Sequence, residues 1–124
     1  MTSPPSLLRG VRGAITVDRD DPDAIRDATT EMLRALLERN GLDDDRLVSM
    51  LFTMTPDLRA EFPAVAAREM GLRHVPLLCA AEIDVPGAIG RCIRVLVHCY
   101  MPPAAAVRHV YLREARALRT DLAD

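Results

Sequence analysis

The fold is most readily inferred from one stretch, Cys92-Ile93-Arg94-Val95-Leu96-Val97-His98-Cys99-Tyr100. It is rich in β-branched, aromatic and other apolar residues, a composition that predicts a β-strand. Arg94 lies within Cys92–Val97, an otherwise uncharged run, and arginine is rarely buried in proteins unless it is paired. Either one face of the strand meets solvent and Arg94 simply points outward, or Arg94 has a functional role. The stretch alone favours neither interpretation over the other.

Three earlier strands and two helices are predicted on the N-terminal side of this stretch. The strands are expected over residues 8–17, 47–53 and 75–81. The first helix begins at Asp21-Pro22, a capping carboxylate followed by a first-turn proline, and ends at Asn40-Gly41. The second helix is short and covers residues 63–70. Strands separated by helices predict an α/β (α+β) fold, with a mixed β-sheet and two helices on one face.

The chain of 124 residues is expected to form one domain, with residues 1–6 as a flexible tail. Residues 104–118 are ambiguous. Their alanines and arginines favour a helix, whereas the alternation of Val107, His109 and Tyr111 favours a strand. Helices on one face would leave the other face of the sheet uncovered. We therefore expect the chain to cover that face by forming a closed oligomer.

Composition excludes several classes of function. The charged fraction is 27% and the net charge is −2, which argues against nucleic acid as a partner. All 16 basic residues are arginine, so a lysine Schiff base is excluded and every fixed cation is a planar fork suited to carboxylates. The three cysteines have no metal-ligand spacing, and their odd number fits a reduced, cytoplasmic setting. The longest uncharged stretch, residues 95–107, is too short to span a membrane, and the N-terminus does not resemble a signal peptide.

Arginines are the most promising candidates for binding chemistry. Arg12 lies between Gly10 and Gly13, which could let a ligand approach the backbone but more often mark a bulge. Arg68 and Arg119 are two further candidates, although arginines in such positions are more often solvated surface charges than ligand contacts. Together these residues would suit a small polyanion.

Few other side chains offer chemistry. Glu82 follows Ala80 and Ala81, small residues that leave room beside its carboxylate, and Cys79 lies three positions earlier. Tyr111 could reach a ligand with its hydroxyl, although a half-buried core tyrosine is more usual. The sequence has no glycine-rich phosphate loop, no Ser-His-Asp pattern and no metal-binding helix motif. The residues therefore suit binding of a small anion, or a reaction that needs only electrostatics and shape.

An ordered set of short stretches carries a resemblance to a known family. The set comprises Arg9-Gly-Val-Arg-Gly-Ala14, Thr55-Pro-Asp-Leu58, Phe62-Pro-Ala64, Ala67-Arg-Glu69, Val75-Pro76, Cys79, Glu82-Ile-Asp-Val85, Cys92-Ile-Arg-Val95, Arg108-His-Val-Tyr-Leu112, Leu118-Arg119 and Asp121-Leu122. In this order, and over residues 9–122, the chain resembles the AroH class of monofunctional chorismate mutases.

The resemblance implies a fold, an assembly and a reaction. The family forms a homotrimer in which the sheets pack into a pseudo-α/β-barrel, with active sites in clefts between subunits. It rearranges chorismate to prephenate by an intramolecular Claisen reaction, without a cofactor, a metal or a covalent intermediate. Such an enzyme selects a compact substrate conformer and stabilises the negative charge that grows on the ether oxygen. The resemblance also favours a strand over residues 107–118.

The family's site residues map onto matching positions of this chain. Arg94 would donate to the ether oxygen and Arg12 to the carboxylate of the enolpyruvyl arm, which Tyr111 would also contact. Glu82 and Cys79 would face the ring and its hydroxyl. The resemblance further implies an apolar wall and two arginines at the mouth of the site: Phe62, Ala64, Leu77 and Leu118, with Arg68 and Arg119.

Two positions depart from the family pattern. Val65 stands where the family commonly has a lysine, and Leu78, beside the substrate ring, stands where it has a threonine. These changes bear on affinity more than on the type of reaction. Two other functions share the arginine set or the trimer: a small-carboxylate-binding or regulatory module without catalysis, and an imine hydrolase of the Rid type.

Overall fold

A computed structural model describes the backbone of residues 6–122 and the side chains of residues 6–118. Its strands are β1 (Leu7–Thr16), β2 (Leu47–Met54), β3 (Leu77–Ala81), β4 (Cys92–Met101) and β5 (Val110–Leu112). Its helices are α1 (Pro22–Arg39), α2 (Ala64–Glu69) and the 3₁₀ helices η1 (Asp44–Arg46) and η2 (Arg113–Leu122). Residues 1–5, most of the expected tail, lie outside the described part.

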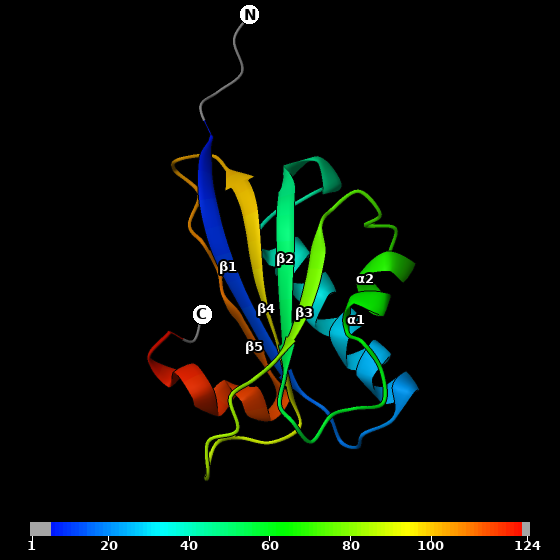
Figure 1. The fold of residues 1–124 in the computed structure, drawn as a ribbon. Helices are drawn as coiled ribbons and strands as arrows, with labels where there is room; N and C mark the ends of the chain where they lie inside the picture. The colour runs from blue at the N-terminus through cyan, green and yellow to red at the C-terminus, as the bar shows by residue number, and fades with distance from the viewer. Residues whose placement is uncertain (1–5, 123–124) are drawn as a thin grey trace, which may run out of the picture.

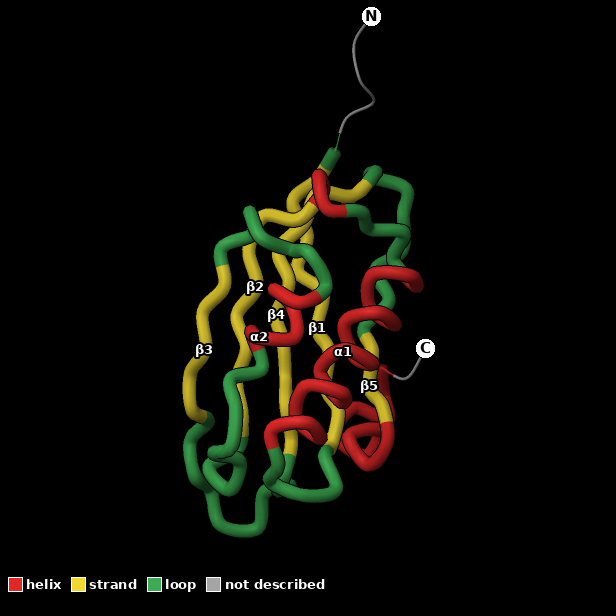
Figure 2. Tube along the Cα trace, turned by 90° about the vertical axis from the view of Figure 1, so that its right-hand side faces the viewer, coloured by secondary structure: helices red, strands yellow, loops and turns green. Residues whose placement is uncertain are grey.

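The strands form one five-stranded sheet in the order β3-β2-β4-β1-β5 (Figure 1). β4 is antiparallel to both β1 and β2, whereas β2 pairs with β3 and β1 pairs with β5 in parallel. Both α1 and α2 lie on one side of this sheet (Figure 2). The predicted mixed sheet with two helices on one face is confirmed.

Helix α1 begins and ends where local chemistry requires. The side chain of Asp21 accepts a hydrogen bond from the backbone N–H of Ala24, at 3.0 Å, and Pro22 occupies the first turn. After the last turn, Gly41 adopts a φ of +59°, a conformation that favours glycine. The buried face of the helix consists of Ile25, Ala28, Thr29, Met32, Leu33 and Leu36. This stripe packs on the sheet and forms the main core.

Gly13 lets α1 approach β1 closely. A Cβ atom at this position would lie 3.0 Å from Val95 Cγ1 and 3.2 Å from both Leu36 Cδ1 and Met32 Cγ. The pairing of β1 with β4 is unbroken from Leu7 to Thr16, so the glycines do not mark a bulge between these strands. Gly13 therefore serves helix packing, and its neighbour Arg12 emerges on the opposite face of the sheet.

The C-terminal segment differs from the predicted strand over residues 107–118. Only Val110–Leu112 pair with β1, and a 3₁₀ helix follows from Arg113, whose φ is +56°. Arg113 donates to the backbone oxygen of Thr16, at 3.1 Å, and to Glu31, at 3.0 Å. Ala115 is buried against Ala14 and Cys92. The strand ends early because these tertiary contacts turn the chain, so that η2 covers one end of the face opposite α1.

Candidate functional site

We use the term open face for the side of the sheet away from α1 and α2. Strand alternation places Arg12 and Ala14 of β1, Arg94 and Leu96 of β4 and Thr53 of β2 on this face. They surround a pocket of about 330 Å³. Its full lining comprises Arg12, Gly13, Ala14, Leu51, Thr53, Arg94, Val95, Leu96 and Tyr111. This open-face pocket thus brings together three of the predicted site residues: Arg12, Arg94 and Tyr111.

Arg94 occupies the centre of the open face because of the register of β4. Its neighbours across the sheet are Ala14 on β1 and Thr53 on β2, both small residues that leave space above the strand. Arg94 Nε lies 3.0 Å from Glu82 Oε2, yet it makes no aligned hydrogen bond. The attraction is therefore that of an ion pair, with the Arg94 side chain 41% exposed and that of Glu82 16% exposed. The Arg94 side chain lines the open-face pocket, with part of its surface exposed to solvent.

Glu82 lies at the end of β3, beside the open-face pocket, where it contacts Arg94. Its backbone N–H donates to the oxygen of Met54, which extends the β2–β3 pairing by one residue and turns Glu82 onto the open face. Thr53 Oγ1 donates to Glu82 Oε2 at 2.7 Å. One carboxylate oxygen thus meets both a hydroxyl and a guanidinium. Two of the predicted site residues, Arg94 and Glu82, therefore form an ion pair within a single chain.

Cys92 lies two residues before Arg94 on the same face, under η2. Burial raises the pKa of the Cys92 thiol to about 11, although the Arg94 guanidinium opposes the shift. The thiol is therefore uncharged near neutral pH and is a poor nucleophile. An uncharged Cys92 thiol does not compete with an anionic ligand for Arg94.

Arg12 and Tyr111 flank Arg94 from the other side. Arg12 is exposed and pairs with Leu96 across β1 and β4, while Tyr111 is half-buried and lies opposite Ala14. The backbone N–H of Arg12 donates to His109 Nδ1 at 2.9 Å. The arrangement offers two guanidinium groups and one phenol to a ligand in the open-face pocket.

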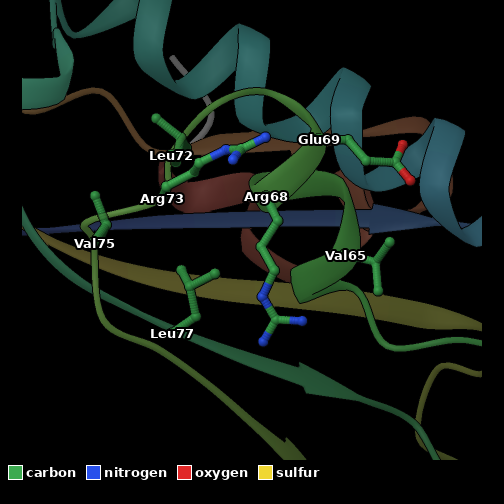
Figure 3. A pocket seen from close by; sticks show the side chains of 7 residues that line it. All are labelled: Val65, Arg68, Glu69, Leu72, Arg73, Val75 and Leu77. Atoms are coloured by element: carbon green, nitrogen blue, oxygen red, sulfur yellow. The ribbon is translucent and has the colours of Figure 1, made fainter.

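A second group of predicted residues lies on the other side of the sheet. Leu77 and Cys79 alternate with Leu78 along β3, so they face the core and the helices. Leu77 and Arg68 line a pocket of about 580 Å³ with Val65, Glu69, Leu72, Arg73 and Val75 (Figure 3). Figure 3 shows Arg68 extending from α2 toward the edge of the sheet, on the side of Leu77, whereas Glu69 points toward α1. We call this region the α2–β3 edge.

The remaining predicted residues divide between the same two regions. Ala64 is buried in the first turn of α2, and Phe62 precedes it with 66% of its surface exposed. Leu78 lies on the open face beside Leu51 and is 65% exposed. Leu118, which lies on η2, packs beside the small cluster of Ala14, Cys92 and Ala115. The side chain of Arg119 lies outside the described part.

The pocket and its immediate surroundings contain residues that the sequence did not single out. Thr53 and Leu51 come from β2 and face Arg94 and Leu96 only because β2 and β4 pair in this register. His109 contacts the backbone of Arg12 from a segment 97 positions away. Alternation along residues 47–53 predicts that Leu51 and Thr53 lie on the same face of their strand. No signal in the sequence reveals which strand lies beside them in the sheet.

Neither a metal site nor a membrane span is found in the described part of the chain. Within residues 6–122, no group of three or more His, Cys, Asp or Glu side chains is placed to hold a metal ion. None of the helices over the same residues has the length and apolar content to cross a membrane.

Comparison with known proteins points to one family. The chain is 52% identical over 118 residues to chorismate mutase AroH of Thermus thermophilus, covering 94% of this chain and 97% of that protein. It is 42% identical to chorismate mutase AroH of Bacillus subtilis (strain 168), with coverage of 94% and 93%. The solved structure of a chorismate mutase from Clostridium thermocellum superimposes with a TM-score of 0.83 at 42% identity, over 88% of this chain and 98% of that one. Residues 8–122 match the family described as chorismate mutase type I, and the chain therefore belongs to that family.

Proposed function

We propose that this protein is a chorismate mutase, an isomerase that converts chorismate to prephenate on the route to phenylalanine and tyrosine. The observation that carries the proposal is Arg94, which lines the open-face pocket together with Arg12 and is paired with Glu82. Membership of the family and the preformed pair support the same reaction. No cofactor and no covalent intermediate are required.

The chemistry asks for charge stabilisation at one oxygen. In the rearrangement the ether C–O bond breaks while a C–C bond forms, and negative charge grows on the departing oxygen. Arg94 donates to that oxygen and is more strongly attracted to it in the transition state than in the ground state. Glu82, held by Thr53, keeps the guanidinium oriented and faces the part of the ring that becomes electron-poor. Arg12 and Tyr111 bind the carboxylate of the enolpyruvyl arm.

The predicted site is divided between opposite faces of the sheet. Arg12, Arg94 and Glu82 lie on the open face, whereas Arg68 and Cys79 belong to the α2–β3 edge. One small substrate cannot contact both groups within a single chain. We propose that the α2–β3 edge of a second copy closes the open-face pocket in a homotrimer. In that arrangement Phe62, Ala64, Leu77 and Leu118 form the apolar wall, with Leu78 beside the ring and Arg68 and Arg119 at the mouth.

The three cysteines support a setting for the reaction. Cys79, Cys92 and Cys99 are all unpaired, a pattern typical of a reducing compartment. We place the enzyme in the cytoplasm on this ground.

The test of function is to add chorismate to the purified protein and follow the appearance of prephenate. Replacing Arg94 with alanine should lower kcat about 10²-fold or more, because the ether oxygen loses its donor. Arg94→Lys should remain poor, since an ammonium lacks the planar fork. Arg34→Ala removes an exposed arginine from the outer side of α1 and serves as the control. A folded protein without turnover, or an Arg94→Ala variant with unchanged kcat, would refute the proposal.

Glu82→Ala separates catalysis from simple binding. A carboxylate-binding module would keep its affinity without Glu82, because arginines supply the attraction to the ligand. An enzyme would lose turnover in this variant, since Arg94 loses the carboxylate that orients it. The comparison requires kcat and the Kd for prephenate in the same preparation.

A further inference from the structure

The short strand β5 meets β1 close to Arg12. Only three residue pairs join these strands, from Gly13 with Val110 to Ile15 with Leu112. Arg12 and His109 are the next residues in this register, just beyond the paired segment. The pairing of β5 with β1 therefore ends one residue short of Arg12, the proposed substrate-binding arginine of the open-face pocket.

At Arg12, His109 supplies the hydrogen-bond acceptor that a backbone oxygen would provide if the pairing of β5 with β1 continued. The N–H of Arg12 donates to His109 Nδ1 at 2.9 Å, across 97 positions of sequence. A ring nitrogen that accepts a hydrogen bond must carry a lone pair, so the imidazole bears its proton on Nε2. The ring therefore closes the edge of β1 at Arg12, where no backbone group of β5 does so.

The segment that carries His109 is itself anchored to α1. Asn40 Oδ1 accepts from the N–H of Arg108 at 2.8 Å, and Asn40 Nδ2 donates to the oxygen of Arg108 at 2.9 Å and to that of Leu36 at 2.8 Å. The Asn40 side chain therefore satisfies both backbone groups of Arg108 from the end of α1. His109 consequently presents its ring from a fixed point rather than from a free loop.

We propose that His109 is a positioning residue that acts through Arg12. By fixing the backbone of Arg12, it directs the guanidinium into the open-face pocket beside Arg94 and Tyr111. Arg12 binds a carboxylate that is present in both substrate and product. Loss of His109 should therefore weaken binding more than it slows the chemical step. The inference rests on the proposed function, which assigns that carboxylate to Arg12.

Two substitutions separate the acceptor from the ring. His109→Phe keeps a planar ring without an acceptor, whereas His109→Asn keeps an acceptor oxygen at the position of Nδ1 without the ring. We expect His109→Phe to raise KM for chorismate and Kd for prephenate about fivefold to tenfold, the usual cost of one hydrogen bond, with kcat changed less than about twofold. His109→Asn should recover most of the affinity. Equal losses in the two variants, or a loss in kcat alone, would overturn the inference.

A double-mutant cycle with Arg12 tests whether His109 acts through that residue. In an Arg12→Ala background, His109→Phe should change neither KM nor Kd further, because the guanidinium that it positions is absent. Additive losses would show that His109 contributes independently of Arg12, and the inference would be wrong. Thermal unfolding of each variant identifies any general loss of fold.

Calorimetric titration with prephenate keeps the two proposals distinguishable. A wild-type protein that binds prephenate without converting chorismate would refute the proposed function and leave the His109 comparison readable in Kd. A wild-type protein that turns over chorismate while the cycle is additive would refute only the role of His109. A protein that neither binds prephenate nor converts chorismate would overturn both.

Discussion

Glu82 makes two contacts through one carboxylate oxygen, both with residues that line the open-face pocket. Thr53 Oγ1 donates to Oε2 at 2.7 Å, and Arg94 Nε lies 3.0 Å from the same atom. The Thr53 hydroxyl occupies one lone pair and limits rotation of the carboxylate. Orientation of Arg94 therefore depends on a residue that the reacting atoms need not touch.

Replacing Thr53 with valine tests this dependence. Valine keeps the shape and the β-propensity of threonine but removes the donor, so Glu82 loses one of its two restraints. We expect kcat to fall about tenfold to a hundredfold, the scale of one hydrogen bond to a charged group, with little change in KM. Thr53→Ser, which retains the hydroxyl, should stay close to wild type. Steady-state kinetics with chorismate decide the matter, and an undiminished kcat in Thr53→Val would contradict the role.

At the scale of elements, the approach of α1 to β1 determines where Arg12 and Ala14 stand. A Cβ atom at Gly13 would lie only 3.0–3.2 Å from its neighbours, which is tighter than ordinary contact. A Cβ atom at Gly10, on the same strand, would lie 3.5 Å from Leu96 Cδ1, an ordinary contact distance. A methyl group at position 13 would push apart Val95, Met32 and Leu36. The two glycines therefore form a matched pair for mutation.

Gly13→Ala should lower the free energy of unfolding by about 1–3 kcal/mol, the usual cost of adding a group to a tightly packed core. Gly10→Ala should change it by less than about 1 kcal/mol, since its methyl group has space and alanine restricts the unfolded chain. Urea unfolding monitored by circular dichroism measures both. Equal effects of the two substitutions would mean that α1 moves away freely.

A hydrogen-bonded carboxylate links the turn after β2 to the start of β4. Asp57 accepts from the N–H of Arg91, at 2.8 Å to Oδ2 and 3.1 Å to Oδ1, and from Thr55 Oγ1 at 2.6 Å. Burial favours the neutral acid, yet these hydrogen bonds together with the charge of Arg91 hold the pKa of Asp57 below its ordinary value. The bonds therefore favour the ionised form.

This lowered pKa makes stability depend on pH in a defined direction. The contribution of Asp57 is present above its unfolded-state pKa, about 3.9, and is lost as the pH falls through the lower folded-state pKa. Urea midpoints measured from pH 7 to pH 3 should therefore fall at the acidic end. Asp57→Asn should show a shallower decline than wild type over the same range. Parallel curves for the two proteins would remove Asp57 from the explanation.

At the scale of the whole molecule, the open face carries large apolar side chains that a single chain leaves exposed to solvent. Leu8 is 57% exposed, Leu78 65% and Tyr100 47%, and all three project from this face. Burial of such a surface stabilises an assembly by roughly 25 cal/mol for each Å² of apolar area. The patch adjoins the open-face pocket, where the proposed trimer needs a neighbouring chain.

Leu8→Asp should dissociate the trimer and abolish turnover, because a carboxylate would be buried between chains without a partner. Light scattering after size-exclusion chromatography should give three times the 13.7 kDa chain mass for wild type and a lower mass for the variant. Leu7→Asp provides the control, since Leu7 is similarly exposed but projects from the other face of β1. An intact, active Leu8→Asp trimer would place the interface elsewhere.

Local sequence determined the major elements and the family. The Asp21-Pro22 start, the Gly41 stop and the apolar spacing between them are sufficient to predict α1, because capping and helical periodicity depend only on neighbouring residues. The run of residues 92–100 likewise predicted β4. The ordered set of short stretches identified the family, which the comparisons confirmed.

Only the tertiary structure decided which distant residues meet. The β2–β4 register places Thr53 opposite Arg94, and the end of β5 places His109 against Arg12. Contacts of Arg113 and Ala115 replace a predicted strand with η2. These outcomes depend on packing between segments far apart in the chain, where local propensities are nearly balanced. A sequence pattern therefore predicts which face of an element is apolar, whereas packing determines what that face meets.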